Sequence, residues 1–417
     1  MATRLYGIVW RWHFLFGMAA TPIVLVIALT GALYAFEPEL SATLDDRVDV
    51  APTETWIDLD RVAALGAAVP RCTPGSIYIP SRRDRTFTVH CEQGEHHQVL
   101  VDPYRARAVA EREGHSVFDI VFDLHWELML GEGGRRIIEW ATSCVVALML
   151  SGVILWWPRG KRTTEGVWTI RRGQKTRTLL RDVHAVVGVY ALPVLFVMTA
   201  TGLMWTIHAG GRRWAPLVDD AVTQSFNADP KSTPGPTKLS IAAAVRAAGY
   251  DRATDPRAVF LSLPKEPTDT YGVYIYDDEQ TTPWVTQAVT VDAYSGKVLR
   301  SLSWRDRSAL GKVDTLRYSL HVGSILGLPG RIAAVVGVLV LSALCITGPW
   351  MWWKRRPAKK LGIPPRAKKV PIPLWIALAL LGALLPLLGY TLLAVVGIEL
   401  TRYVVRLIAS RSVGTVP

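Results

Sequence analysis

The fold of this chain is constrained most by five long apolar stretches. They contain no acidic or basic side chain other than one histidine. They cover residues 14–36, 140–157, 183–207, 332–353 and 370–398. A bilayer core of roughly 30 Å is crossed by about 20 apolar residues in α-helix. The sequence therefore predicts a polytopic α-helical membrane protein with five spans, the last of them kinked at Pro386.

The composition agrees with a membrane location. Charged residues make up 20% of the chain and apolar residues 50%, whereas soluble domains carry about 25% charged residues. The formal net charge is +12 and the chain contains 16 tryptophans, which is typical of basic and aromatic residues at membrane interfaces. We therefore expect contact with membrane lipid and no nucleic-acid partner.

Lysine and arginine in two short loops predict the orientation, because basic residues resist translocation. Segments 158–182 and 354–369 are strongly basic and are expected on the cytoplasmic side. The N-terminus is then cytoplasmic. The expected division is spans at 1–36, 135–157, 183–207 and 331–353, outer domains at 37–134 and 208–330, cytoplasmic loops at 158–182 and 354–369, and a fifth span with a tail at 370–417.

The first and last apolar stretches bear on how the two ends of the chain are placed in the membrane. The first is longer than the apolar part of a signal peptide and no clear cleavage site follows it, which predicts a retained anchor. The fifth span would place the C-terminus outside. That position conflicts with the basic residues 402, 406 and 411.

Repeated spacings predict an internal duplication of a unit made of span, outer domain and span. His13 precedes a Thr-Gly pair by the same number of residues as His184 does. His125 and His321 precede a Gly-Arg pair, a Ser-Gly or Thr-Gly pair and a Trp-Trp pair at matching distances. The paired elements are Thr30-Gly31 and Thr201-Gly202, Gly134-Arg135 and Gly330-Arg331, Ser151-Gly152 and Thr347-Gly348, and Trp156-Trp157 and Trp352-Trp353.

Each outer segment is expected to form a small α+β domain. Short alternating stretches predict strands at 76–80, 86–91, 258–262 and 271–276, and Ala-rich stretches predict one helix each at 58–69 and 240–249. Residues 101–104 (VDPY) resemble residues 291–294 (VDAY), and each reads as a strand that runs into a turn.

Four of the nine histidines occupy the duplicated positions, namely His13, His125, His184 and His321. A histidine in or beside a span is costly without a partner and is a functional-site candidate. A pseudo-twofold axis would bring His13 to His184 and His125 to His321. Six-coordinate haem needs one imidazole on each side of its plane, and a four-helix interior can supply the slot. We therefore expect two haem b groups, one near each membrane face.

Other interpretations of these histidines stay open. A single histidine near a span end is more often an interfacial or hydrogen-bonding residue than a ligand. Zinc and copper sites usually need three or four ligands at one level, and two pairs at opposite faces do not match that requirement.

Further candidates lie at the outer ends of the spans. Arg135 and Arg331 can pair with haem propionates or serve as plain helix-end charges. His208 lies just past the third span and can ligate iron or contact substrate. The equivalent offset in the first copy holds Glu37, so the duplication does not support His208 as a shared ligand.

The first outer segment carries two more groups of interest. His96 and His97, near Glu92 and Glu95, form either an exposed metal site or a solvated turn. Two cysteines, Cys72 and Cys91, flank strand-like stretches, and an oxidising compartment would favour a disulfide between them. The remaining pair, Cys144 and Cys345, lies in spans at non-equivalent offsets, which indicates packing. No CxxC or CxxCH occurs, so structural zinc and covalent haem lack their signatures.

These segments together resemble the PepSY-associated transmembrane family over roughly residues 5–357. The resemblance rests on WRWH (10–13), LHWELMLGEGGR (124–135), DVHAVVGVY (182–190), LHVGSILGLPGR (320–331), and the WWPR and WWKRR span ends. The stretches VDPYRARAV and VDAYSGKVL resemble PepSY modules, the first without the usual glycine after the turn.

The resemblance implies a fold and an activity. The fold is a duplicated four-helix haem-binding core plus a fifth helix, with two PepSY-like periplasmic domains. Members of the family include dihaem ferrisiderophore reductases of the bacterial inner membrane. The expected function is electron transfer from a quinol or a cytoplasmic reductase, through haem at His13 and His184 and haem at His125 and His321, to Fe(III) in a siderophore, which releases Fe(II). No GxGxxG fingerprint occurs, so a nicotinamide or flavin donor would be a separate protein.

Two functions of other classes remain possible. One is a haem-free PepSY binding or regulatory protein. The other is a transporter accessory protein whose histidines relay protons, although no Asp, Glu or Lys occupies mid-span depth, where pumps usually need such groups.

Overall fold

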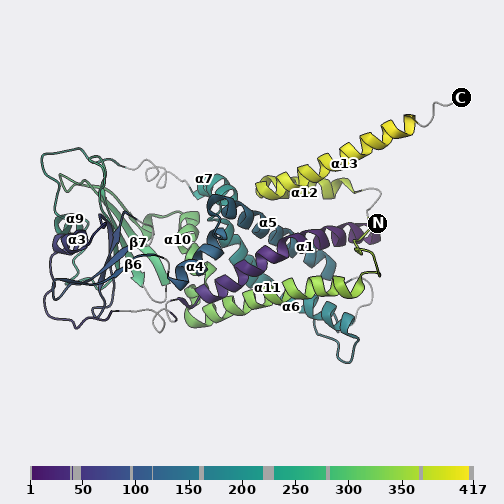
Figure 1. Ribbon diagram of the computed structural model, residues 1–417, viewed down its shortest axis with the longest axis horizontal. Helices are drawn as coiled ribbons and strands as arrows, with labels where there is room; N and C mark the ends of the chain where they lie inside the picture. The colour runs from purple at the N-terminus through teal and green to yellow at the C-terminus, as the bar shows by residue number, and fades with distance from the viewer. Residues whose placement is uncertain are drawn as a thin grey trace. The chain divides into compact units, whose positions relative to one another are not determined.

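The computed structural model describes residues 2–37, 40, 48–93, 97–114, 116–158, 164–218, 230–278, 282–365 and 370–412. The chain forms two compact units. Unit 1 consists of Met1–Ala32, Phe122–Pro216 and Ala333–Pro417, and unit 2 consists of Leu33–Val121 and Leu217–Ile332. Unit 1 is helical, whereas unit 2 contains the β-sheet (Figure 1).

Four helices of the described chain are long and apolar enough to cross a membrane. They confirm four of the five predicted spans, and each begins before its apolar stretch because polar residues extend the helix at its N-terminal end. These helices are α1 (Ala2–Tyr34), α5 (Gly131–Trp156), α6 (Thr176–Leu203) and α11 (Gly327–Arg355), and the shorter elements near them are α4 (Val117–Glu127), η1 (Ile207–Trp214), α7 (Ala215–Val218) and η3 (Ser324–Leu326).

The predicted fifth span is not one helix. Helix α12 (Ile372–Leu384) ends at Leu385, and α13 (Pro386–Ser412) begins at the next residue. Proline has no N–H and disfavours helical backbone in the residue before it, which explains the break. The prediction of a single kinked span was therefore wrong, because the apolar parts, Ile372–Leu384 and Pro386–Ile398, are each shorter than a span.

The two C-terminal helices form a hairpin within unit 1. An added Cβ at Gly382 would lie 2.9 Å from the Cα of Gly389, so the backbones touch where no side chain intervenes. Helix α13 folds back from the tip of the hairpin (Figure 1). The chain therefore returns toward the end of unit 1 from which α12 starts.

Unit 2 is built on one eight-stranded antiparallel sheet of order β4-β3-β2-β1-β5-β6-β7-β8. Its strands are β1 (Pro74–Ile79), β2 (Phe87–Cys91), β3 (Gln98–Asp102), β4 (Arg107–Arg112), β5 (Val259–Ser262), β6 (Tyr271–Asp278), β7 (Thr282–Val291) and β8 (Val298–Ser303). Strands β1 and β5 pair with Ile77 opposite Leu261. The two predicted outer domains are therefore halves of one sheet, which leaves neither half with an exposed inner edge.

Each half of the sheet carries one helix, as the sequence predicted. Helices α3 (Leu59–Ala67) and α9 (Ile241–Ala247) begin at the capping side chains of Asp58 and Ser240. The Asp60 carboxylate accepts hydrogen bonds from the backbone N–H groups of Ile241, at 2.8 Å, and of the next residue, which connects the two helices. Both helices pack on one apolar core, whose central side chains are Val62, Ile77, Val89, Val99, Ala244, Val259 and Val273. Unit 2 also contains η2 (Trp304–Asp306) and α10 (Ala309–His321).

The repeated Val-Asp motif forms the same turn in both halves. Asp102 accepts hydrogen bonds from the backbone N–H groups of Tyr104 and Arg105. Asp292 accepts them from Tyr294 and Ser295 and also from Thr233. Burial alone would raise the pKa of Asp292, but these N–H groups outweigh it and lower the pKa to about 2. After the turn, Gly296 adopts a φ of 72° and Ala106, which replaces the usual glycine, a φ of 52°.

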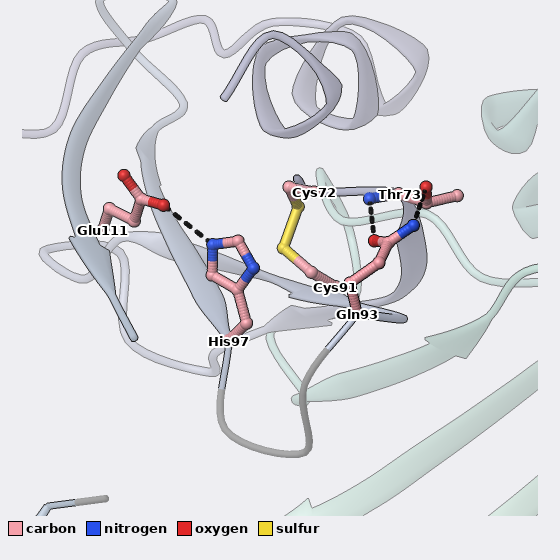
Figure 2. Close-up of a disulfide and its surroundings, with 6 residues drawn as sticks. All are labelled: Cys72, Thr73, Cys91, Gln93, His97 and Glu111. Carbon is pink, nitrogen blue, oxygen red and sulfur yellow. Dashed lines mark hydrogen bonds and ion pairs between the residues drawn. A yellow bond between two sulfur atoms is a disulfide. The ribbon is translucent and has the colours of Figure 1, made fainter. Parts of the chain in front are cut away.

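A disulfide joins Cys72, before β1, to Cys91 at the end of β2, which confirms that prediction (Figure 2). In the same part of the sheet, the imidazole of His97 is only 3% exposed and its Nε2 lies 2.8 Å from Glu111 Oε1. The solvated-turn interpretation was therefore wrong for His97, because the pair with Glu111 allows its burial. Glu95 and His96 lie outside the described residues.

Candidate metal centre

Two of the predicted histidines face each other inside unit 1. His13 lies on α1 and His184 on α6, and the centres of their imidazole rings are 6.4 Å apart with planes at 83°. A bond from a metal to an imidazole nitrogen is about 2 Å, and the ring centre lies about 1 Å farther, so two imidazoles on opposite sides of one ion have centres about 6 Å apart. The observed spacing fits one ion between the rings.

Hydroxyl groups determine which nitrogen of each ring is available. His13 Nδ1 lies 2.8 Å from Ser151 Oγ, and His184 Nδ1 lies 2.9 Å from Thr347 Oγ1. Each hydroxyl lies 2.6–2.8 Å from the carbonyl oxygen four residues earlier and donates its proton there. The hydroxyl oxygen must then accept from Nδ1–H, which leaves the lone pair of each imidazole on Nε2.

The repeated Ser-Gly and Thr-Gly pairs explain this geometry locally. Ser151 and Thr347 are oriented by hydrogen bonds to the carbonyl groups of their own helices, α5 and α11. Cβ atoms added at the following glycines, Gly152 and Gly348, would lie 3.6 and 3.7 Å from Cε1 of the facing histidine. In the sequence these pairs served only as spacing markers, and the structure shows that they support the histidines.

The donor set limits the kind of metal group. Within the described part of the chain, no group of three or more His, Cys, Asp or Glu side chains is arranged to hold a metal ion. His13 and His184 thus supply a pair of nitrogen ligands, and haem is one metal group that takes such a pair of imidazoles.

His125 is held by the first of the Thr-Gly pairs. Its Nδ1 lies 2.9 Å from the carbonyl oxygen of Ile27 and 3.4 Å from Thr30 Oγ1. Because a carbonyl only accepts, Nδ1 carries the proton and Nε2 the lone pair. An added Cβ at Gly31 would lie 2.8 Å from His125 Cε1, so the imidazole packs directly against this glycine. Burial lowers the pKa of His125 and keeps the ring neutral.

His321 is the last residue of α10 and belongs to unit 2, whereas His125 belongs to unit 1. The pairing of these two histidines stays a prediction. The second Thr-Gly pair repeats the first in its local structure, since Thr201 Oγ1 donates to Val197 O at 2.7 Å as Thr30 Oγ1 does to Val26 O at 2.7 Å.

We compared the sequence with models of protein families and with curated proteins. The model of the PepSY-associated TM region matches residues 10–355, which include all four helices and all four histidines. The chain belongs to the PepSY-associated TM family. No curated protein was found to match the chain. The C-terminal hairpin lies outside the PepSY-associated TM region.

Two arginines of the PepSY-associated TM region were predicted to contact haem propionates. The guanidinium of Arg135, on α5, lies 4.8 Å from the ring centre of Trp126, the neighbour of His125. Arg331, on α11, is only 8% exposed and lies 5.1 Å from the ring centre of Phe36. These contacts fix where the arginines lie, and their role toward propionates stays a prediction.

The PepSY-associated TM region also contains a buried carboxylate that the sequence pattern did not predict. Glu139, in the third turn of α5, is fully buried. Its oxygens accept hydrogen bonds from the backbone of His208 and Ala209, and one lies 3.1 Å from His208 Nδ1. The equivalent offset in the second copy holds Val335, so the repeat pattern contained no signal for this residue. The expectation from the sequence concerned mid-span depth, whereas Glu139 lies toward the N-terminal end of α5, just before the apolar stretch 140–157.

Proposed function

We propose that this chain is an inner-membrane b-type dihaem reductase that carries electrons across the membrane and reduces Fe(III) in a periplasmic siderophore chelate, with release of Fe(II). The observation that carries the proposal is the spacing of His13 and His184, with Nδ1 of each ring held by a hydroxyl. Membership of the PepSY-associated TM family supports it.

In this proposal the residues of the chain have distinct tasks. His13 and His184 present Nε2 from opposite sides, and Ser151 and Thr347 keep both rings in the required tautomer and orientation. His125, whose ring contacts Ile27 and Gly31, and His321 are the residues that would hold the second haem. Bound haem supplies reversible one-electron chemistry, which no amino-acid side chain of the site provides.

The disulfide supports a periplasmic location of unit 2. Bonded cysteines persist in oxidising compartments, and Cys72 and Cys91 both lie in this unit. The basic segments before α6 and before α12 support a cytoplasmic location of those loops. With this orientation, His13 and His184 serve electron entry and the other pair serves electron exit. Arg135 and Arg331 lie at the exit end of their helices, where the haem propionates are proposed to pair with them.

The substrate needs no covalent catalysis by the protein. Siderophores bind Fe(III) far more tightly than Fe(II), so transfer of one electron to the iron is sufficient to weaken its binding. Unit 2 is the part of the chain proposed to receive the chelate. His208 belongs to unit 1 and is proposed as a separate candidate for contact with iron.

The test is the visible spectrum of the purified chain, oxidised and after dithionite, together with a pyridine haemochrome count. We expect low-spin b-type bands and two haem groups per chain. Substitution of both His13 and His184 by alanine should remove one group and leave the other. A colourless protein from haem-supplied cells would contradict the proposal and favour a haem-free PepSY binding protein.

A further inference from the structure

Unit 1 contains a second space beside His13. A cavity of about 690 Å³ lies between α1 and α5 on one side and the C-terminal hairpin on the other. Its lining contains His13 and Ser151 but no residue of α6 or α11, which carry His184 and Thr347. The cavity is therefore not the slot between the two imidazoles, although it touches the same histidine.

The lining is almost entirely apolar. Leucine, isoleucine, valine and alanine side chains predominate, and the polar side chains of the lining are Trp12, His13 and Ser151. The last two are hydrogen-bonded to each other at 2.8 Å. A nucleotide or flavin phosphate would need cationic groups or backbone N–H groups directed at it. The lining side chains include no Lys or Arg, and His13 has the neutral tautomer described above. The occupant must be apolar.

The hairpin that closes the cavity is firmly attached to the four-helix core. Leu385 and Leu388 are buried in the same cluster as Phe16 and Cys144. The indole Nε1 of Trp140 donates to Thr391 Oγ1 at 3.0 Å, which ties α5 to α13. Because the hairpin lies outside the PepSY-associated TM region, the cavity is a feature that this chain adds to the family core.

We infer that this cavity binds the ring and the first isoprenoid units of a membrane quinol, which acts as the electron donor to the iron at His13. The inference rests on the proposed reductase function. The volume lies within the range of about 300–1,000 Å³ that is usual for small-molecule pockets. A lipid-soluble donor reaches the cavity from the bilayer, and its ring would lie against a ligand of the metal.

The electron balance is simple. Oxidation of the quinol to the quinone breaks two O–H bonds and releases two electrons and two protons. Haem held at His13 would take up the electrons one at a time, and each pair would suffice for two Fe(III) in siderophore. The two protons would be released to water, since the lining side chains include no carboxylate and the His13 Nδ1 already bears a proton.

The test compares two substitutions on α12. Ala377 and Ala379 are both exposed on α12, but Ala377 lines the cavity and Ala379 does not. Ala377→Phe should fill the space and Ala379→Phe should not. Leu374→Trp, also in the lining, is a second filling variant in case the first does not fold. A wild-type dithionite-reduced spectrum is the criterion of correct folding.

The first readout is chemical and does not depend on activity. Organic extracts of the purified chain are analysed for quinone and phospholipid. We expect about one quinone per wild-type or Ala379→Phe chain, and at least tenfold less in Ala377→Phe. Phospholipid without quinone in the wild type, or equal quinone in both variants, would overturn the inference.

The second readout is the rate at which decylubiquinol reduces the haem in the purified chain. It should fall at least tenfold in Ala377→Phe and stay at the wild-type value in Ala379→Phe. Equal rates in the two variants would overturn the inference. If the wild type contains no haem, the reductase proposal fails, and the quinone content still decides whether the cavity binds a quinone.

Discussion

Removal of the Ser151 hydroxyl tests the geometry of the inner site most directly. In Ser151→Ala the Nδ1–H of His13 loses the acceptor that lies 2.8 Å away. The imidazole is half-buried and lines the apolar cavity, whose other polar side chain, Trp12, is a donor, so the orphaned N–H finds no other side-chain acceptor there. A buried donor without a partner costs about 1–3 kcal/mol, and in haem-bound protein this cost opposes the orientation that presents Nε2.

The cost can be converted into an expected change in haem affinity. Since each 1.4 kcal/mol is a factor of ten, a loss of about 1–3 kcal/mol corresponds to roughly 5- to 150-fold weaker binding. Loss of a hydrogen-bond partner of a metal-bound histidine usually costs 10–100-fold, which agrees with this range. Haem held by the other histidine pair should be unaffected, so one half of the haem should become labile.

The assay measures the rate at which excess apomyoglobin removes haem from the purified chain. Wild-type protein should lose both groups slowly, and Ser151→Ala should lose one group much faster. Ser151→Thr should behave as wild type, because threonine occupies the equivalent position at Thr347. Ser143→Ala is the matched control, since Ser143 Oγ, on the same helix, is buried and has no hydrogen-bond partner in the described structure.

The reasoning would be refuted by two results. One is a Ser151→Ala protein that retains both haem groups as the wild type does. The other is a Ser143→Ala protein that loses haem as fast as Ser151→Ala, since that would show a general effect of loosening α5.

Three further predictions concern stability, all measured as the thermal midpoint of the purified full chain. The pKa of Asp292 is about 2, against an ordinary value of 3.8. This shift implies about 2 kcal/mol of stabilisation that is present above pH 4 and is lost as the pH falls toward 2. Asp292→Asn should therefore destabilise the chain at pH 7 and much less at pH 2.5, and an equal effect at both pH values would contradict this. Ala106→Gly should raise the unfolding free energy by roughly 1 kcal/mol, because the φ of 52° disfavours alanine; a lower midpoint would contradict it. Glu139→Ala leaves N–H groups of His208 and Ala209 without an acceptor and should lower the free energy of unfolding by about 2–5 kcal/mol. Glu139→Gln keeps an acceptor oxygen and should lower it clearly less. Equal losses in the two variants would argue against the hydrogen bonds as the cause.

Local pattern was sufficient for much of the fold. The strands expected at 76–80, 86–91, 258–262 and 271–276 correspond to β1, β2, β5 and β6, and the two expected helices to α3 and α9. Apolar length alone located four membrane helices. These features depend on residues that are close in sequence, so periodicity and caps predict them.

Contacts between residues far apart in the sequence could not be predicted from local patterns. Nothing in the periodicity of either outer segment indicated that β1 would pair with β5, because each segment reads as a complete α+β domain on its own. The break at Leu385 depended on the contact between Gly382 and Gly389 as well as on Pro386, and the apolar run could not distinguish a kinked span from a hairpin. The cavity beside His13 exists only because of this hairpin.

The sequence by itself determined that this is a membrane protein, that four histidines occupy repeated positions and that two cysteines flank predicted strands. Hydropathy and spacing are properties of the chain alone. Only the tertiary structure decided that His13 and His184 face each other at 6.4 Å with hydroxyls on both Nδ1 atoms. Only the tertiary structure buried Glu139 against His208. The physical reason is that hydrogen bonds and packing between distant residues form when helices meet, and no local pattern encodes which side chains will then be neighbours.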